Sequence, residues 1–283
     1  MKNFFASLLQ RSLIASLLIC PFVSSAQADK PVTAIPYFSD PALSPDATEI
    51  AFVSGGDIWT VPAAGGDAHL LVSHPDYDSR PIYSPDGKYL AFTSTRSGNG
   101  DIYVLDLGSN ELNRITFDDG FDDGSSWSAD GKYIYYSSTS KDIAGMRDIF
   151  KIAAGGGTPI AVSDTRYVSE FFPMPSPDNK VLAVSAHGVA AAQWWRNGHS
   201  HLDESEIWLM KENNAYEQFT PGGAKHLWPM WSSDGKAIYY VSDESGTQNL
   251  YMKPLTGNAK KLTSFSSGRV LWPTMAYNGK AIV

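Results

Sequence analysis

One short segment of the chain concentrates side chains that could bind a metal ion. His199, His201 and Asp203 lie within five residues of each other, and Glu204 follows directly. Two imidazoles and a carboxylate form a ligand set that zinc accepts. The segment is open to three interpretations, a metal site, a structural insertion, or a surface that contacts a partner or substrate. We favour the structural insertion, because alternating histidines at the start of a strand are more often hydrogen-bonded surface groups. No metal or cofactor is therefore assigned.

The same segment approaches the G-x-S-x-G turn that presents the nucleophile in many serine hydrolases. It reads Gly198-His199-Ser200-His201-Leu202, so leucine stands where the final glycine is required. The sequence indicates neither an acid partner nor oxyanion-binding groups, which a serine nucleophile needs. We therefore assign no catalytic residue to this chain.

A second polar segment, Asp118 to Gly124, contains four aspartates in seven residues and invites a calcium interpretation. It lacks the D-x-D-x-D-G spacing with a distal glutamate that calcium-binding loops use. We expect a solvated turn between two repeats instead.

The elements that must position these residues repeat along the chain. A Ser-Pro-Asp-Gly turn or a close variant occurs six times, and its third residue is Asp46, Asp86, Asp130, Asp178, Asp234 and Asn278. These anchors follow each other at 40, 44, 48, 56 and 44 residues. Serine caps locally, proline presets φ, and glycine accepts a positive φ, so each turn is expected to join two antiparallel strands.

Each repeat contains segments for four strands. The second strand follows the turn directly, as Tyr89 to Thr93 does, and a third carries an acidic-Ile-aromatic motif such as Asp57-Ile58-Trp59. The fourth ends in a pair such as Ile115-Thr116. Four strands in about 44 residues are typical of a β-propeller blade. We predict an all-β fold, a six-bladed β-propeller of four-stranded antiparallel blades that start near residues 41, 81, 125, 173, 229 and 273.

A proline stands five residues before the anchor in every repeat except the third, where Ser125 replaces it. Because proline is tolerated at the first residue of a strand, we expect these positions to mark where the innermost strands begin, at one mouth of a central channel. The residues just before them would form a ring at that mouth: Asp40, Arg80, Gly124, Phe172, Trp228 and Trp272. Two interpretations remain open for its aromatic side, packing between blades or binding of a peptide or protein loop through Trp and Arg anchors.

Residues 1–28 are expected to be a signal peptide. Lys2 and Arg11 supply positive charge, an apolar stretch follows, and Ala26-Gln27-Ala28 matches a cleavage site. The apolar stretch is too short to span a bilayer. We expect cleavage after Ala28, a lead-in at residues 29–38, and the propeller at residues 39–283. The sixth repeat stops at Val283 in its second strand, so we expect an incomplete last blade and a longer parent polypeptide.

Removal of the signal peptide would leave 20 basic residues, 30 acidic residues and no cysteine. This acidity argues against a nucleic-acid partner, because phosphate binding needs a clustered basic surface. The lack of cysteine excludes thiol catalysis and cysteine-ligated zinc. We expect a periplasmic or secreted protein with no membrane span after signal cleavage.

The repeat Ser-Pro-Asp-Gly-Lys-Tyr-Leu-Ala-Phe-Thr-Ser (84–94), followed by Gly-Asp-Ile-Tyr-Val (100–104), resembles the repeats of TolB and of the N-terminal six-bladed propeller of tricorn-type serine peptidases. The resemblance covers residues 36–283. The first repeat (57–66), followed by Ser73-His74-Pro75 and Ser79-Arg80-Pro81, is more similar to the tricorn type.

This resemblance implies a noncatalytic scaffold that gates peptides through its channel, with proteolysis carried by C-terminal domains that are absent here. One alternative is a TolB-like protein that acts through protein contacts, although the smaller α/β domain that precedes the propeller in TolB is missing from this sequence. Another is the propeller of a different hydrolase. On every interpretation, the expected partners are peptides or proteins at the propeller channel.

Overall fold

The chain divides into two units, Met1–Ile35 and Pro36–Val283. The computed structural model describes residues 37–142, 145–165, 167–187, 204–211 and 215–283, all in the second unit. The expected signal peptide and most of the lead-in therefore lie outside the described residues. No helix among the described residues is long and apolar enough to cross a membrane.

The described residues form five four-stranded antiparallel sheets, each with its strands in chain order. The first sheet contains β1 (Ser39–Leu43), β2 (Glu49–Ser54), β3 (Asp57–Pro62) and β4 (His69–Val72). The second contains β5 (Asp78–Tyr83), β6 (Tyr89–Ser94), β7 (Asp101–Asp106) and β8 (Leu112–Arg114). The third contains β9 (Asp122–Trp127), β10 (Tyr133–Ser138), β11 (Asp148–Ala153) and β12 (Ile160–Ala161).

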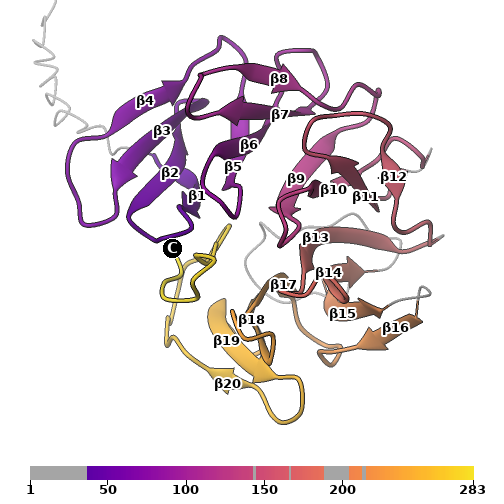
Figure 1. Ribbon diagram of the computed structural model, residues 1–283. Helices are drawn as coiled ribbons and strands as arrows, with labels where there is room; N and C mark the ends of the chain where they lie inside the picture. The colour runs from indigo at the N-terminus through magenta and orange to yellow at the C-terminus, as the bar shows by residue number, and fades with distance from the viewer. Residues whose placement is uncertain (1–36, 143–144, 166, 188–203, 212–214) are drawn as a thin grey trace, which may run out of the picture. The chain divides into compact units, whose positions relative to one another are not determined.

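The fourth sheet contains β13 (Ser169–Pro175), β14 (Leu182–His187), β15 (Glu206–Lys211) and β16 (Ala215–Gln218). The fifth contains β17 (His226–Trp231), β18 (Ala237–Ser242), β19 (Asn249–Pro254) and β20 (Lys260–Lys261). The first strands of successive sheets contact each other in series, β1 with β5, β5 with β9, β9 with β13 and β13 with β17. The sheets are therefore the blades of a propeller, with their first strands nearest the axis (Figure 1).

The serine-aspartate turns form as the repeat predicts. In the second blade, Oγ of Ser84 donates to Oδ1 of Asp86 over 2.7 Å and accepts the backbone N–H of Tyr89. The fourth turn residue, Gly87, has φ +71°. The other four blades repeat the serine-aspartate bond. Each turn thus connects the innermost strand to the second strand of its blade.

Apolar residues cover both faces of the second strands, as expected for stacked blades. Leu90 and Phe92 of β6 pack with Val53 and Ile58 of the first blade, whereas Ala91 faces the third blade with Trp127. Burial of both faces explains why these strands are continuously hydrophobic rather than alternating. The core is therefore a series of layers between neighbouring blades.

The expectation of six blades is wrong for the described residues, which form five. The sixth repeat makes its turn, with Gly279 N–H bonded to the Ala276 carbonyl. Its flanks pair over a short stretch only, at the bridge between Met275 and Ile282 and through two backbone hydrogen bonds between Thr274 and Val283. Residues 274–283 supply two short paired segments, whereas each of the five blades has four strands. The C-terminal segment lies between the first and fifth blades in Figure 1.

Candidate functional site

The innermost strand of each blade has a β-bulge at the repeat position that holds proline in four blades and Ser125 in the third. In β5 the pairing register shifts between Ser79 and Ile82, so Arg80 and Pro81 lie within the bulge. The innermost strands of the other four blades show the same shift. We expected these prolines to mark the starts of the innermost strands. That expectation is wrong, because they lie inside the strands. A bulge tolerates proline inside a strand, because the bulged residue needs no ladder hydrogen bond.

Five of the six predicted ring residues have a left-handed backbone conformation, and Gly124 is the exception. Asp40, Arg80, Phe172, Trp228 and Trp272 have φ values between +48° and +57°. Such values are uncommon for residues with a side chain and cost energy, so their recurrence at one repeat position marks a constrained feature. All six residues of the predicted ring, including Gly124 of the third repeat, line one cavity of about 60 Å³. That volume holds a few water molecules and no peptide.

An arginine flanked by two carboxylates forms one side of this ring. Nε of Arg80 lies 3.3 Å from Oδ1 of Asp40 and 3.4 Å from Oδ1 of Asp123. Nη1 of Arg147 lies 2.9 Å from Oδ2 of Asp123. Burial raises the pKa of the Asp40 carboxyl, and the positive charge of Arg80 opposes that shift. The arrangement satisfies a guanidinium group that is itself largely buried.

Asp123 is a site residue that the sequence analysis missed. The solvated turn expected at residues 118–124 is wrong in its second half, since Asp122 and Asp123 begin β9 and are buried. The sequence did contain a signal for Asp123, because this residue directly precedes Gly124, the ring position of the third repeat.

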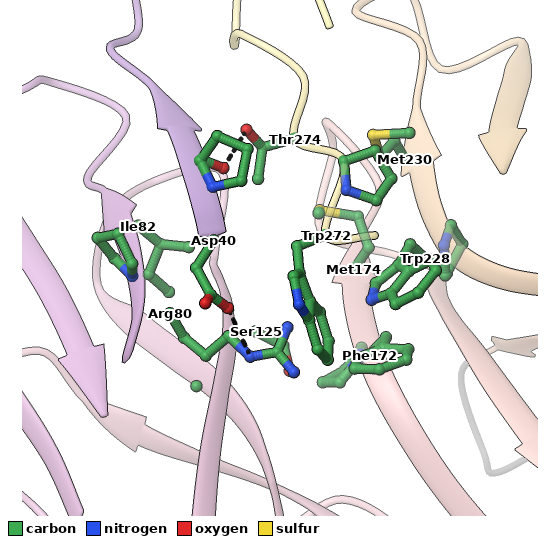
Figure 2. A pocket seen from close by; sticks show the side chains of 16 residues that line it. Asp40, Arg80, Ile82, Ser125, Phe172, Met174, Trp228, Met230, Trp272 and Thr274 are labelled. Carbon is green, nitrogen blue, oxygen red and sulfur yellow. Dashed lines mark hydrogen bonds and ion pairs between the residues drawn. The ribbon is translucent and has the colours of Figure 1, made fainter. Parts of the chain in front are cut away.

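Aromatic rings form the other side. Cζ of Arg80 lies 2.9 Å from the centroid of the Trp272 ring, which packs edge-on against Trp228 with centroids 5.1 Å apart. Phe172 stacks on Trp228 at 5.3 Å. Figure 2 shows the Arg80 guanidinium group beside Trp272, with Phe172 and Trp228 beyond it. Trp228 and Phe172 are buried. Arginine and aromatic groups together thus close the channel at the level of the bulges.

A wider cavity of about 340 Å³ adjoins this closure on the side of the serine-aspartate turns. We call it the vestibule. The residue that follows each proline position contributes to it in all six repeats: Ala42, Ile82, Ser126, Met174, Met230 and Thr274. Aromatic and methionine side chains one position further on complete much of its wall: Tyr83, Trp127, Trp231 and Met275. Sequence reasoning missed the vestibule, although its residues hold constant positions in the repeat.

The sixth repeat forms no blade, but its residues line the channel as those of the other repeats do. Oγ1 of Thr274 donates to the Pro41 carbonyl over 2.9 Å, and the Tyr277 hydroxyl donates to the Tyr83 carbonyl over 3.3 Å. Elsewhere in the ring, Nε1 of Trp127 donates to the Ile82 carbonyl of the preceding blade. These bonds satisfy carbonyl groups at or near the bulges and join the C-terminal segment to the first two blades.

The predicted metal candidates His199, His201 and Asp203 lie outside the described residues, as does the serine of the incomplete hydrolase motif. Glu204 is described and is partly buried. In the parts of the chain that the structure does describe, no group of three His, Cys, Asp or Glu side chains could hold a metal ion.

Comparisons with known proteins agree with this architecture. The chain has a fold similar to that of tricorn protease, with 18% identity and a TM-score of 0.71 over 84% of this chain and 24% of that chain. A TolB-like protein from Agrobacterium tumefaciens shares 18% identity at a TM-score of 0.66, over 80% of each chain. TolB from Acinetobacter baumannii shares 23% identity at a TM-score of 0.63, over 78% of this chain and 52% of that chain. These likenesses show a common fold.

A family model extends the agreement from fold to sequence. The model of the tricorn protease N-terminal beta propeller domain matches residues 35–283. This range includes all five blades, the ring of bulges and the C-terminal segment that joins them. The chain therefore belongs to the family of tricorn protease N-terminal β-propeller domains.

Proposed function

We propose that this chain is a noncatalytic propeller module that receives an extended peptide in its vestibule and gates the peptide's passage at the ring of bulges. In this role it is the scaffold of a tricorn-like serine peptidase, in which other domains carry out proteolysis. One observation carries the proposal: an open, apolar vestibule of about 340 Å³ adjoins a closure that leaves only about 60 Å³. A cavity of the first size accommodates peptide side chains, whereas the second admits none.

The chemistry of the vestibule suits varied peptide sequences. Met174, Met230 and Met275 line it beside aromatic rings. Methionine side chains are flexible and polarisable, so they adapt to apolar groups of different shape. A gating module needs this tolerance, because it must admit many peptides and need not select one.

The closure can act as a gate because one side chain, Arg80, makes its central contact. Arg80 is held by ion pairs to Asp40 and Asp123 and by stacking on Trp272. A change of rotamer that moves the Arg80 guanidinium group toward one carboxylate would separate it from the indole ring and widen the axis.

Peptide binding to the whole chain tests the proposal. Fluorescently labelled extended peptides with apolar side chains are titrated into the wild type, into Met275→Lys in the vestibule, and into the matched control Met252→Lys on β19. Both methionines are partly buried, but only Met275 lines the vestibule. We expect Met275→Lys to weaken binding about tenfold and Met252→Lys to leave it unchanged. Equal affinities for the two variants, with melting curves like the wild type, would refute the vestibule as the binding site.

Export through residues 1–28 is part of the proposal and has its own test. We infer a periplasmic or secreted location from the basic start, apolar stretch and Ala26-Gln27-Ala28 motif. Mass spectrometry of the protein expressed with its natural N-terminus should find a chain that begins at Asp29. Recovery of only the uncleaved chain from the cytoplasm would contradict export.

A stand-alone module that acts through protein contacts is the second possibility. It is supported by the similarity in fold to two TolB proteins, at TM-scores of 0.66 and 0.63. The two proposals differ in what binds. A protein-contact module would retain a folded partner in crosslinking experiments even when Met275→Lys had removed peptide binding.

A further inference from the structure

A separate pocket lies on one face of the fourth blade, away from the channel. Its volume is about 250 Å³, and its walls include Glu170 of β13, Glu206 and Trp208 of β15, and Tyr216 of β16. His187, the last residue of β14, lines it too. None of these residues belongs to the ring or to the vestibule, so the proposed channel function does not use them.

Strand register explains why these side chains meet. Glu170 pairs with Ala186, and Ala186 pairs with Glu206, so the three positions share one face across three strands. Trp208 is two residues after Glu206 and projects to the same face. Tyr216 pairs with Met210, which is two residues further on, and so joins that face. The sheet therefore places two carboxylates at one end of a short apolar and aromatic surface.

The Glu170 carboxyl is the unusual group in this pocket. Glu170 is 1% exposed, and its Oε2 atom has no hydrogen-bond partner among the described residues. Burial raises the pKa of Glu170, and the nearby carboxylates of Asp148 and Asp164 raise it further, although the hydroxyls of Ser163 and Tyr216 oppose the shift. A buried carboxyl with an unused acceptor atom is costly unless a cation or donor reaches it. The residues described as lining the pocket include neither lysine nor arginine.

The walls favour an organic cation over a metal ion. Across the described residues, no three His, Cys, Asp or Glu side chains gather as a metal site. The pocket instead sets indole and phenol rings beside carboxylates. Aromatic faces attract ammonium and guanidinium groups, and a carboxylate supplies their counter-charge. The aliphatic stem of such a cation can pack on Val168 and Ala186 in the same pocket.

We propose that this pocket binds an ammonium or guanidinium group on an aliphatic stem, with Glu170 and Glu206 as counter-charges and Trp208 as the aromatic wall. Such a group occurs in a lysine or arginine side chain of a peptide and in a free alkylamine. The proposal does not depend on the channel. A basic ligand occupies the fourth blade whether or not a peptide enters the vestibule.

Calorimetric titration of the whole chain tests this site. The probes are N-acetyl-lysine methylamide, N-acetyl-arginine methylamide, butylamine, and N-acetyl-norleucine methylamide, which has the lysine stem without its charge. We expect saturable binding of at least one cation and none of the norleucine derivative. Binding of butylamine at equal affinity would indicate a free amine as ligand, and binding of only the amino-acid derivatives would indicate a peptide side chain. Absence of saturable binding by all three cations at millimolar concentration would overturn the proposal.

Matched variants assign the binding to the pocket. Glu170→Gln keeps the shape of the side chain and removes its charge, and should weaken the cation about tenfold or more. Glu217→Gln is the control, because Glu217 lies on the other face of β16 and pairs with Lys211 at the surface. It should leave the affinity unchanged. If Glu170→Gln unfolds, Glu206→Gln provides the same comparison at a partly exposed position. Binding that survives loss of either charge would place the cation elsewhere.

Discussion

The guanidinium carbon of Arg80 lies 2.9 Å from the centroid of the Trp272 ring, so the second repeat touches the sixth across the channel axis. The two residues hold equivalent repeat positions, one before each proline, and have φ values of +55° and +57°. Their contact requires the chain to have turned through the intervening blades. It is therefore a direct consequence of the circular arrangement, and it makes stability and channel closure depend on the same groups.

Removal of the Arg80 charge should be strongly destabilising. Arg80→Met leaves the buried carboxylates of Asp40 and Asp123 without the guanidinium group that lies 3.3 Å and 3.4 Å from them. Removing one partner of a buried ion pair typically lowers the free energy of unfolding by about 3–5 kcal/mol. Urea denaturation should show this loss in the free energy of unfolding. The double variant Arg80→Met, Asp40→Asn should recover much of it, because Asp123 keeps its ion pair with Arg147. A double variant as unstable as Arg80→Met would contradict the electrostatic explanation.

His226 should make the protein less stable in mild acid. It is 1% exposed, and burial lowers its pKa from 6.5 to about 4. Between these values the unfolded chain binds a proton that the folded chain does not, so the contribution of this group is full above pH 6.5 and falls as pH decreases toward 4. The loss amounts to about 3 kcal/mol. The measurement is the difference in unfolding free energy between His226→Gln and the wild type at several pH values, which should change steadily across this window; a constant difference would exclude His226 as the source.

Asp122 should have the opposite pH dependence. Burial raises the pKa of this fully buried carboxyl from 3.8 to about 7. The folded chain therefore holds a proton that the unfolded chain releases, and stability falls as pH rises through that range. Asp122→Asn should raise the free energy of unfolding at pH 8 by several kcal/mol, about 4 at most, and change little at pH 3.5. A destabilised variant at pH 8 would show that the charge is needed in the folded protein.

The serine of each repeat turn should contribute to stability through two hydrogen bonds. Ser84→Ala removes the bond to Asp86 and the acceptor for the Tyr89 N–H, both of which are local to the turn. We expect a loss of about 1–2 kcal/mol in thermal or urea unfolding. Ser109→Ala, in an exposed hairpin between β7 and β8, is the matched control and should cost much less. Equal effects would mean that the repeat serine is conserved within the chain for a reason other than stability.

The repeat pattern was sufficient to predict the strands and their order. Turn residues such as Ser84 and Gly87 act through neighbours no more than five positions away, so their geometry is encoded locally. The acidic-Ile-aromatic segments likewise became third strands in four blades, for example at Asp101 in β7, and the variant Asn249-Leu250-Tyr251 begins the third strand of the fifth. Periodicity also grouped Asp40, Arg80, Phe172, Trp228 and Trp272 at one position before any of them could be placed in space.

Tertiary structure decided what those grouped residues do. The sequence alone placed the prolines at strand starts, whereas pairing with the second strand forms a bulge and gives Arg80 a positive φ. Asp123 became a partner of Arg80 only because β9 lies beside β5 in the ring. The pocket around Glu170 likewise needs the register of four strands, which fixes which faces coincide. A repeated sequence determines local geometry at equivalent positions, but contacts across the channel depend on non-local pairing, which no single repeat contains.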